Sequence, residues 1–113
     1  MAPPLVLRML RSLRRLIGWR MPPGLEATSI KFSSRECLHV SYRNQWVDAN
    51  LHFVPKRQWG VDVIVMVFQL QNWKRDGDQA ALVSDVERTQ IANDVQKFLE
   101  YNGCLVELAW TRP

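Results

Sequence analysis

The stretch from residue 61 to residue 70 limits the folds open to this chain more than any other segment. It carries apolar side chains on both of its faces, and only Asp62 interrupts the run. One face holds Val61, Val63, Val65 and Val67, and the other holds Ile64, Met66 and Phe68. A strand that is apolar on both faces is normally central in its sheet and covered on both sides. One cover is expected from a C-terminal helix, and the other from an N-terminal helix, a second copy or a partner.

Three segments before this strand alternate between apolar and polar residues, which is the pattern of half-buried strands. They span residues 27–32, 36–42 and 46–54, and turns at Ser33-Ser34 and Arg43-Asn44-Gln45 separate them. Pro55 ends the third segment, because proline cannot donate to the hydrogen-bond ladder. Short turns between neighbouring strands favour an antiparallel meander.

A helix is predicted from Ser84 to Asn102. Ser84 and Glu87 have the spacing of a capping box, and Gly103 suits a left-handed C-cap. An apolar stripe at helical spacing runs between these ends. The stripe consists of Ile91, Ala92, Val95, Phe98 and Leu99.

Alternating residues from 104 to 110 predict one more strand after the helix. The expected fold class is therefore α+β, with an antiparallel sheet of about five strands packed on the helix of the C-terminal half. Four strands form a meander, and the helix and the last strand follow. We expect this single domain to span residues 21–113 and an extra amphipathic helix to span residues 1–20.

Residues 1–20 contain five arginines and no acidic residue. The rest of the chain holds ten basic and eleven acidic residues, so its net charge is −1, against +4 for the whole chain. Seven apolar residues of the first segment fall on one stripe at about 100° per residue, opposite most of the arginines, which predicts a basic amphipathic helix. The stripe consists of Leu5, Val6, Met9, Leu10, Leu13, Leu16 and Ile17.

Four interpretations of this segment remain open. The helix packs on the domain, lies on an anionic membrane surface, serves as an organelle-type presequence, or precedes a natural start at Met21. No run of residues approaches the length of about 18 apolar residues that a membrane span needs. A binding module for nucleic acid or an anionic membrane surface, using this helix, is the main alternative function.

His39 and His52 are the only histidines, and each takes a polar position in its strand, so both are expected on the outer side of the sheet. With Asp48 and Lys56 nearby in the sequence, they suggest the acid–base pair of a small hydrolase, which is a second alternative. Their spacing matches no zinc motif. Asp76-Gly77-Asp78 is interpreted as a turn, because the other ligands of a calcium loop are missing. We expect no metal and no cofactor.

Cys37 and Cys104 are the only cysteines, and they lack the spacing of a metal or redox motif. Two interpretations remain open for them. They are buried thiols in a reducing compartment, or they form a disulfide between two strands.

Five tryptophans are more than the one or two that average usage gives a chain of this length. Tryptophan and arginine are enriched among the hot spots of protein interfaces. Several of these indoles lie next to basic residues, so they are candidate anchors, although they also suit a fold-back onto the ends of the sheet. The predicted partner-binding residues are Trp46, His52, Lys56, Arg57, Trp59, Trp73 and Arg75. The same pattern suits single-stranded nucleic acid, but the net charge of residues 21–113 disfavours it.

The segment from Val61 to Leu108 combines several local signals. An apolar strand ends in Gln71-Asn72-Trp73, and the polar turn Asp76-Gly77-Asp78 follows it. Then come a capped helix that begins at Ser84 and the strand Cys104-Leu105-Val106-Glu107-Leu108 after Asn102-Gly103. This order resembles the small immunity proteins of bacterial polymorphic toxin and contact-dependent growth inhibition systems, over about half of the chain.

The resemblance implies a protein of the bacterial cytoplasm that binds one cognate toxin domain and neutralises it by occluding its active site or substrate surface. It also implies that the protein is not an enzyme and needs no cofactor. Immunity proteins against nucleases are often acidic, whereas this chain is basic overall, so the chain departs from that pattern in its charge.

Overall fold

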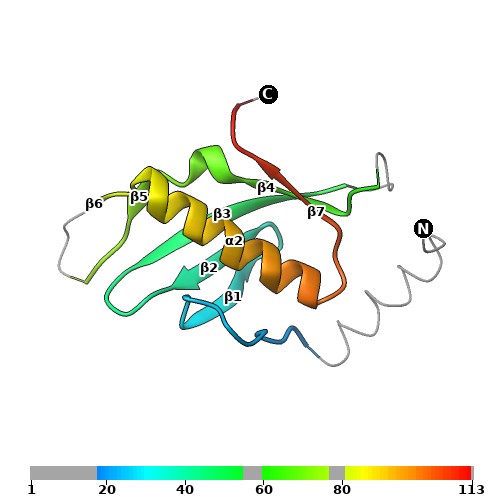
Figure 1. Cartoon of the computed structure of the whole chain (residues 1–113), viewed down its shortest axis with the longest axis horizontal. Helices are drawn as coiled ribbons and strands as arrows, with labels where there is room; N and C mark the ends of the chain where they lie inside the picture. Colours follow the sequence, from blue (N-terminus) through cyan, green and yellow to red (C-terminus); the bar gives the residue numbers. More distant parts are fainter. Residues whose placement is uncertain (1–17, 55–59, 77–80, 113) are drawn as a thin grey trace.

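The computed structural model describes residues 18–54, 60–76 and 81–112 (Figure 1). The helix predicted for residues 1–20 therefore lies outside the described residues except at its end, where residues 18–20 form no regular structure. The described chain has the predicted α+β class, with one long helix lying on a five-stranded sheet.

The first four strands of the main sheet form the predicted meander. Each of them pairs antiparallel with the next in chain order, and the last strand lies at the edge beside the fourth. The strands are β1 (Ser29–Ser34), β2 (Cys37–Ser41), β3 (Trp46–Phe53), β4 (Val63–Met66) and β7 (Val106–Ala109).

The last strand, β7, corrects the prediction of a wholly antiparallel sheet. It pairs with β4 in the parallel direction, with Val63 opposite Val106 and Val65 opposite Leu108. Between the two strands the chain passes through a helix that crosses the sheet (Figure 1). Such a crossover returns the chain to the end of the sheet where the earlier strand began, so the next strand runs the same way.

The strand β4, which the sequence predicts to be central, lies inside the sheet next to the edge strand β7 and is shorter than predicted. It spans four residues between β3 and β7, and after Met66 the chain turns into a 3-10 helix, η1 (Val67–Gln69). The N–H of Leu70 donates to the carbonyl of Val67 at 3.0 Å and closes this turn. Val67 and Leu70 are nevertheless fully buried, which explains why the apolar pattern continues past the end of the strand.

Two short strands precede the long helix. They are β5 (Asn72–Trp73) and β6 (Ala81–Leu82), and they pair antiparallel with each other. Directly after β5, Lys74 and Trp46 exchange backbone N–H to carbonyl hydrogen bonds of 2.9 and 2.8 Å. This bridge attaches the segment after β5 to the beginning of β3.

The helix α2 (Asp85–Tyr101) has the N-cap and the C-cap that the sequence predicts. The hydroxyl of Ser84 accepts from the N–H of Glu87 at 3.1 Å, and the carboxylate of Glu87 accepts from the N–H of Ser84 at 2.9 Å. This is the capping box, and it satisfies donors that the first turn leaves without partners. Gly103 follows the helix with a φ of 92°, a conformation that residues with a Cβ rarely adopt.

Helix α2 covers one face of the sheet, and the core lies between the two layers (Figure 1). Alternate residues of the central strands, such as Leu38, Val40 and Val65, point into this core and are fully buried. The residues between them point to the other side of the sheet, where they are half-buried or exposed. We call this side the open face. Its members include His39, Trp46, Asp48, Asn50, His52, Ile64 and Met66.

A buried carboxylate, Asp94, joins α2 to the rest of the fold. Asp94 is 0 % exposed and accepts hydrogen bonds from the N–H of Ala27 at 3.0 Å and from the hydroxyl of Tyr42 at 2.8 Å. The side-chain amide of Gln90, one turn earlier on the helix, donates to it at 3.1 Å. Because Tyr42 directly follows β2, this network fixes the turn after β2 against the helix.

Candidate partner-binding surface

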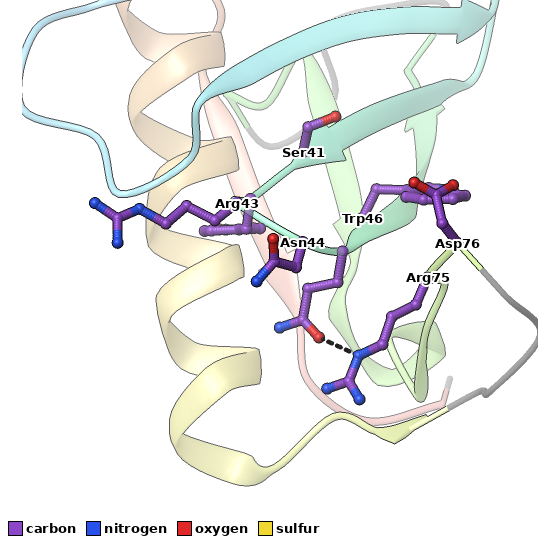
Figure 2. Close-up of a pocket in the computed structure, with 8 residues that line it drawn as sticks. Ser41, Arg43, Asn44, Trp46, Arg75 and Asp76 are labelled. Carbon is purple, nitrogen blue, oxygen red and sulfur yellow. Dashed lines mark hydrogen bonds between the residues drawn. The ribbon is translucent and has the colours of Figure 1, made fainter.

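Three adjoining hollows surround the turn between β2 and β3, which consists of residues 42–45. Their volumes are about 390, 750 and 260 Å³, and Tyr42 and Gln45 line all three. The first two also share Arg43, Asn44 and Arg75. We call the surface formed by residues 42–46, Arg75 and Asp76 the turn surface (Figure 2).

The turn itself is held by the chain around it. The N–H of Tyr42 donates to the carbonyl of Gln45 at 2.8 Å, and the ring of Tyr42 is anchored through its hydroxyl to Asp94. Burial raises the pKa of Tyr42 above its usual value, and the bond to the Asp94 carboxylate raises it further. The hydroxyl therefore stays protonated and keeps donating at physiological pH, which holds the turn in one position.

Two arginines flank this turn. Figure 2 shows the guanidinium groups of Arg43 and Arg75 on opposite sides of it, with Asn44 between them. The Nε–H of Arg75 donates to the side-chain oxygen of Gln45 at 2.9 Å. Both arginines are exposed, so the turn surface presents two cations that are available to an anionic group on a partner.

Trp46 connects the turn surface to the open face. Its side chain lines the first hollow, and the centroid of its indole lies 5.9 Å from that of the His39 ring on the neighbouring strand. The backbone bridge between Trp46 and Lys74 also brings Arg75 and Asp76 to the same end of the sheet. One half-buried indole is thus surrounded by polar and charged groups.

The open face carries a charged network next to Trp46. Asp48 lies opposite His39 in the register of β2 and β3, and one of its oxygens is 3.3 Å from His39 Nδ1. The ammonium of Lys74 donates to the other oxygen at 2.6 Å. This hydrogen bond, together with the negative charge of Asp48, raises the pKa of Lys74 above its usual value. The network holds the three side chains in fixed positions on a surface open to solvent.

His39 and His52 lie far apart on the sheet. His39 lies opposite Asp48, whereas His52 lies four residues further along β3 and opposite Ile64. Four residues of a strand span roughly 13 Å, which is beyond the reach of a proton transfer between the two rings. The structure therefore brings together His39 and Asp48, but not the histidine pair that the hydrolase alternative requires.

For Trp73, the structure favours the interpretation in which the indole folds back onto the sheet over the one in which it is an exposed anchor. It is 3 % exposed and packs edge-on against Tyr42, with ring centroids 5.3 Å apart. The basic residues that follow it suggest a loop in the sequence, but it belongs to β5 and faces the core. Trp73 is therefore buried, whereas Trp46 is half-buried at the surface.

The other predicted partner-binding residues have different outcomes. Trp46 and Arg75 lie at the turn surface, as described above. His52 is exposed on the open face, away from the turn surface along β3. Lys56, Arg57 and Trp59 lie outside the described residues.

Sequence reasoning did not single out Tyr42, Arg43, Asn44 and Gln45 as candidate site residues. It treats residues 43–45 only as a turn, and no local signal shows that Arg75 returns to the same place. That proximity arises from the long-range backbone bridge between Trp46 and Lys74. The only sequence signal for this site is a turn that contains Arg43 and Asn44, followed by a strand that begins with Trp46.

The described residues also bear on metal binding, disulfide formation and membrane crossing. Across residues 18–54, 60–76 and 81–112, no group of three or more His, Cys, Asp or Glu residues is arranged to hold a metal ion. Cys37 and Cys104 do not form a disulfide with each other. Within the same described residues, no helix has the length and apolar character that a membrane crossing requires.

Comparison with known proteins found no match: no family model fits the chain, and no curated protein or solved structure is significantly similar to it.

Proposed function

We propose that this protein binds another protein through the turn surface and the adjoining part of the open face. The observation that carries the proposal is the grouping of Trp46 with two exposed arginines, Arg43 and Arg75, around one set of hollows. Tryptophan and arginine are the side chains most enriched at interface hot spots. A hollow beside an indole also gives a partner side chain a place to be desolvated.

The rigidity of this surface supports the same proposal. Hydrogen bonds fix the side chain of Tyr42 to Asp94 and the side chain of Arg75 to Gln45, and the bridge to Lys74 fixes the backbone of Trp46. A surface that is already partly ordered loses less conformational entropy on binding, so more of the contact energy remains as affinity.

We further propose that the partner is a bacterial toxin domain, and that the protein neutralises it in the cytoplasm by occluding its active site or substrate surface. The resemblance of residues 61–108 to immunity proteins supports this choice of partner. Two arginines on the turn surface favour an acidic patch on the toxin, because opposite charges steer association and fix register. This role requires no chemistry from the immunity protein itself.

A growth assay tests this function. Any toxin-like reading frame found next to the gene of this protein is expressed from an inducible promoter, and the protein is supplied from a second plasmid. The wild-type chain should restore growth, whereas the double variant Arg43→Ala and Arg75→Ala should protect poorly. Loss of two hot-spot side chains is expected to weaken binding by about 2 kcal/mol, which is roughly 30-fold.

The matched control is Arg35→Ala, which removes another exposed arginine from the turn at the opposite end of β2. It should protect as well as the wild type. Full protection by the double variant would exclude the turn surface, and equal failure of the Arg35 variant would show a general effect of lost positive charge. Immunoblots of each variant check that expression levels are the same.

A further inference from the structure

The described part of the chain begins beside the C-terminal end of α2 (Figure 1). The backbone N–H of Arg20 donates to the side-chain oxygen of Asn102 at 2.9 Å, and the side-chain NH₂ of Asn102 donates back to the carbonyl of Arg20 at 2.8 Å. The ring of Trp19 stacks on Phe98, with centroids 5.8 Å apart. These contacts attach the segment that follows residues 1–17 to this end of the helix.

Exposed apolar side chains lie at the same end. Met21 directly follows Arg20 and is 38 % exposed, and Tyr101 directly precedes Asn102 and is 47 % exposed. Leu105 lies three positions after Asn102, where the chain leaves α2 for β7, and is 40 % exposed. We call Met21, Tyr101 and Leu105 the helix-end patch.

Positive charge lies beside the helix-end patch. Arg20 is exposed, and so is Lys97, which lies one helical turn before Tyr101 on the same face of α2. Glu100 is the only acidic residue among the last seven residues of this helix. The sequence of residues 1–17 adds four arginines and no acidic residue. Apolar and basic side chains therefore occur together at this end of the molecule.

This combination is typical of surfaces that lie on anionic membranes. Apolar side chains enter the boundary between the headgroups and the acyl chains, while basic side chains on the polar side contact the anionic lipids. Each basic residue near an anionic leaflet strengthens binding by roughly fivefold. The apolar stripe and the arginines of residues 1–17 have the sequence pattern of the same class.

We propose that the helix-end patch docks on an anionic lipid surface and that residues 1–17 bind the same surface. The lipid headgroups neutralise the arginines, and the three side chains of the patch lose their contact with water. The turn surface adjoins the first two turns of α2, at the other end of the helix, so it stays accessible to a partner protein. This inference goes beyond the proposed function and does not rest on it.

Other partners fit these features less well. Single-stranded nucleic acid would use the positive charge, but its bases stack on aromatic rings, which Met21 and Leu105 lack. A second copy of the chain would bring the same positive charges together, and like charges disfavour such an interface. A lipid surface accommodates the apolar and the basic residues at once.

Sedimentation with vesicles tests this inference on the full chain without a partner protein. Sucrose-loaded vesicles of phosphatidylcholine and phosphatidylglycerol are compared with vesicles of phosphatidylcholine alone. The chain should sediment with the anionic vesicles and stay in solution with the neutral ones. Because salt screens the attraction between exposed charges, binding to the anionic vesicles should weaken as the salt concentration rises.

A triple variant, Met21→Ser, Tyr101→Ser and Leu105→Ser, tests the patch itself. It should bind the anionic vesicles about tenfold more weakly than the wild type, because it removes apolar surface without changing the charge. The matched control is Leu82→Ser with Val86→Ser, which removes two more exposed side chains beside the start of α2 and should bind as the wild type does. Circular dichroism checks that both variants are folded.

A second variant tests the basic residues of the first segment. It replaces all four arginines of residues 1–17 and keeps the apolar residues. The changes are Arg8→Gln, Arg11→Gln, Arg14→Gln and Arg15→Gln. Binding to the anionic vesicles should weaken by more than about a hundredfold, at roughly fivefold for each arginine.

Several outcomes would overturn the inference. The wild-type chain stays in solution with anionic vesicles, sediments equally with neutral ones, or binds no more tightly than the triple variant. Binding of a single-stranded oligonucleotide without binding of vesicles would assign the arginines to nucleic acid instead. Because the vesicles contain no toxin, a negative result is distinct from a failure of the growth assay and leaves the proposed function standing.

Discussion

Replacement of Asp94 by alanine is expected to lower the free energy of unfolding by about 3–5 kcal/mol. The change removes the acceptor of the N–H of Ala27 and the hydroxyl of Tyr42, and both donors lose their partner in or near the core. Each buried donor left without a partner costs about 1–3 kcal/mol, and Gln90 loses its contact as well. Chemical denaturation of the purified chain measures this loss.

Two further variants separate the contributions. Asn93→Ala changes the exposed neighbour of Asp94 on α2 and should shift the free energy of unfolding by less than about 0.5 kcal/mol. Tyr42→Phe removes a single donor and should cost about 1 kcal/mol. A loss below about 1 kcal/mol in the Asp94 variant would contradict the claim that this network joins the helix to the turn.

The same network has a dependence on pH. Burial and the bond to Asp94 raise the pKa of Tyr42 in the folded chain. A group whose pKa is raised on folding stabilises the protein fully below its unfolded pKa, which is about 10 for tyrosine. The contribution of Tyr42 should therefore be constant at neutral pH and decline above about pH 10, and Tyr42→Phe should lack this decline.

Replacement of Trp46 by alanine is expected to weaken binding to the partner by about 2 kcal/mol or more, roughly 30-fold. The indole lines the first hollow and lies beside His39 on the open face, so its loss removes the largest side chain of the turn surface. The backbone bridge to Lys74 does not depend on the side chain. Calorimetric titration of the partner domain into each variant measures the change in affinity.

Tyr101→Ala is the matched control, because it removes an exposed aromatic side chain at the far end of α2. Its affinity should equal that of the wild type. The free energy of unfolding of the Trp46 variant should remain close to the wild-type value, which separates lost contact from lost fold. Unchanged affinity of the Trp46 variant would remove this indole from the interface.

Local signals were sufficient to predict the helix and the meander. Ser84, Glu87 and Gly103 set the ends of α2, and all three act through contacts with residues close in sequence. Period-two alternation placed β1, β2 and β3, because each has one face in the core. Fold features that depend on residues close in sequence could therefore be predicted.

The fold features that the sequence did not predict depend on contacts between residues far apart in the chain. The direction of β7 depends on the path of α2 across the sheet, and the early end of β4 depends on a turn that keeps Val67 and Leu70 buried. The burial of Trp73 likewise follows from the pairing of β5 and from contact with Tyr42. Basic neighbours in the sequence gave no information about either contact.

The candidate site also combines residues that the sequence predicted with long-range contacts that it did not. Trp46 and Arg75 were predicted from composition and position, but their meeting with Arg43 depends on the bridge between Trp46 and Lys74. The bridge joins segments that lie 28 positions apart in the sequence. A sequence pattern does not predict a contact over this separation, so the turn surface could be identified only from the structure.

Size-exclusion chromatography with light scattering tests the central claim most directly. The purified full chain is mixed with the purified domain of any toxin-like reading frame found next to its gene. The proposed function predicts one stoichiometric complex with the wild-type chain and a mostly separate elution with the variant Trp46→Ala, Arg43→Ala, Arg75→Ala. Separate elution of the wild-type chain and the domain, or an equally stable complex with the triple variant, would contradict binding through the turn surface.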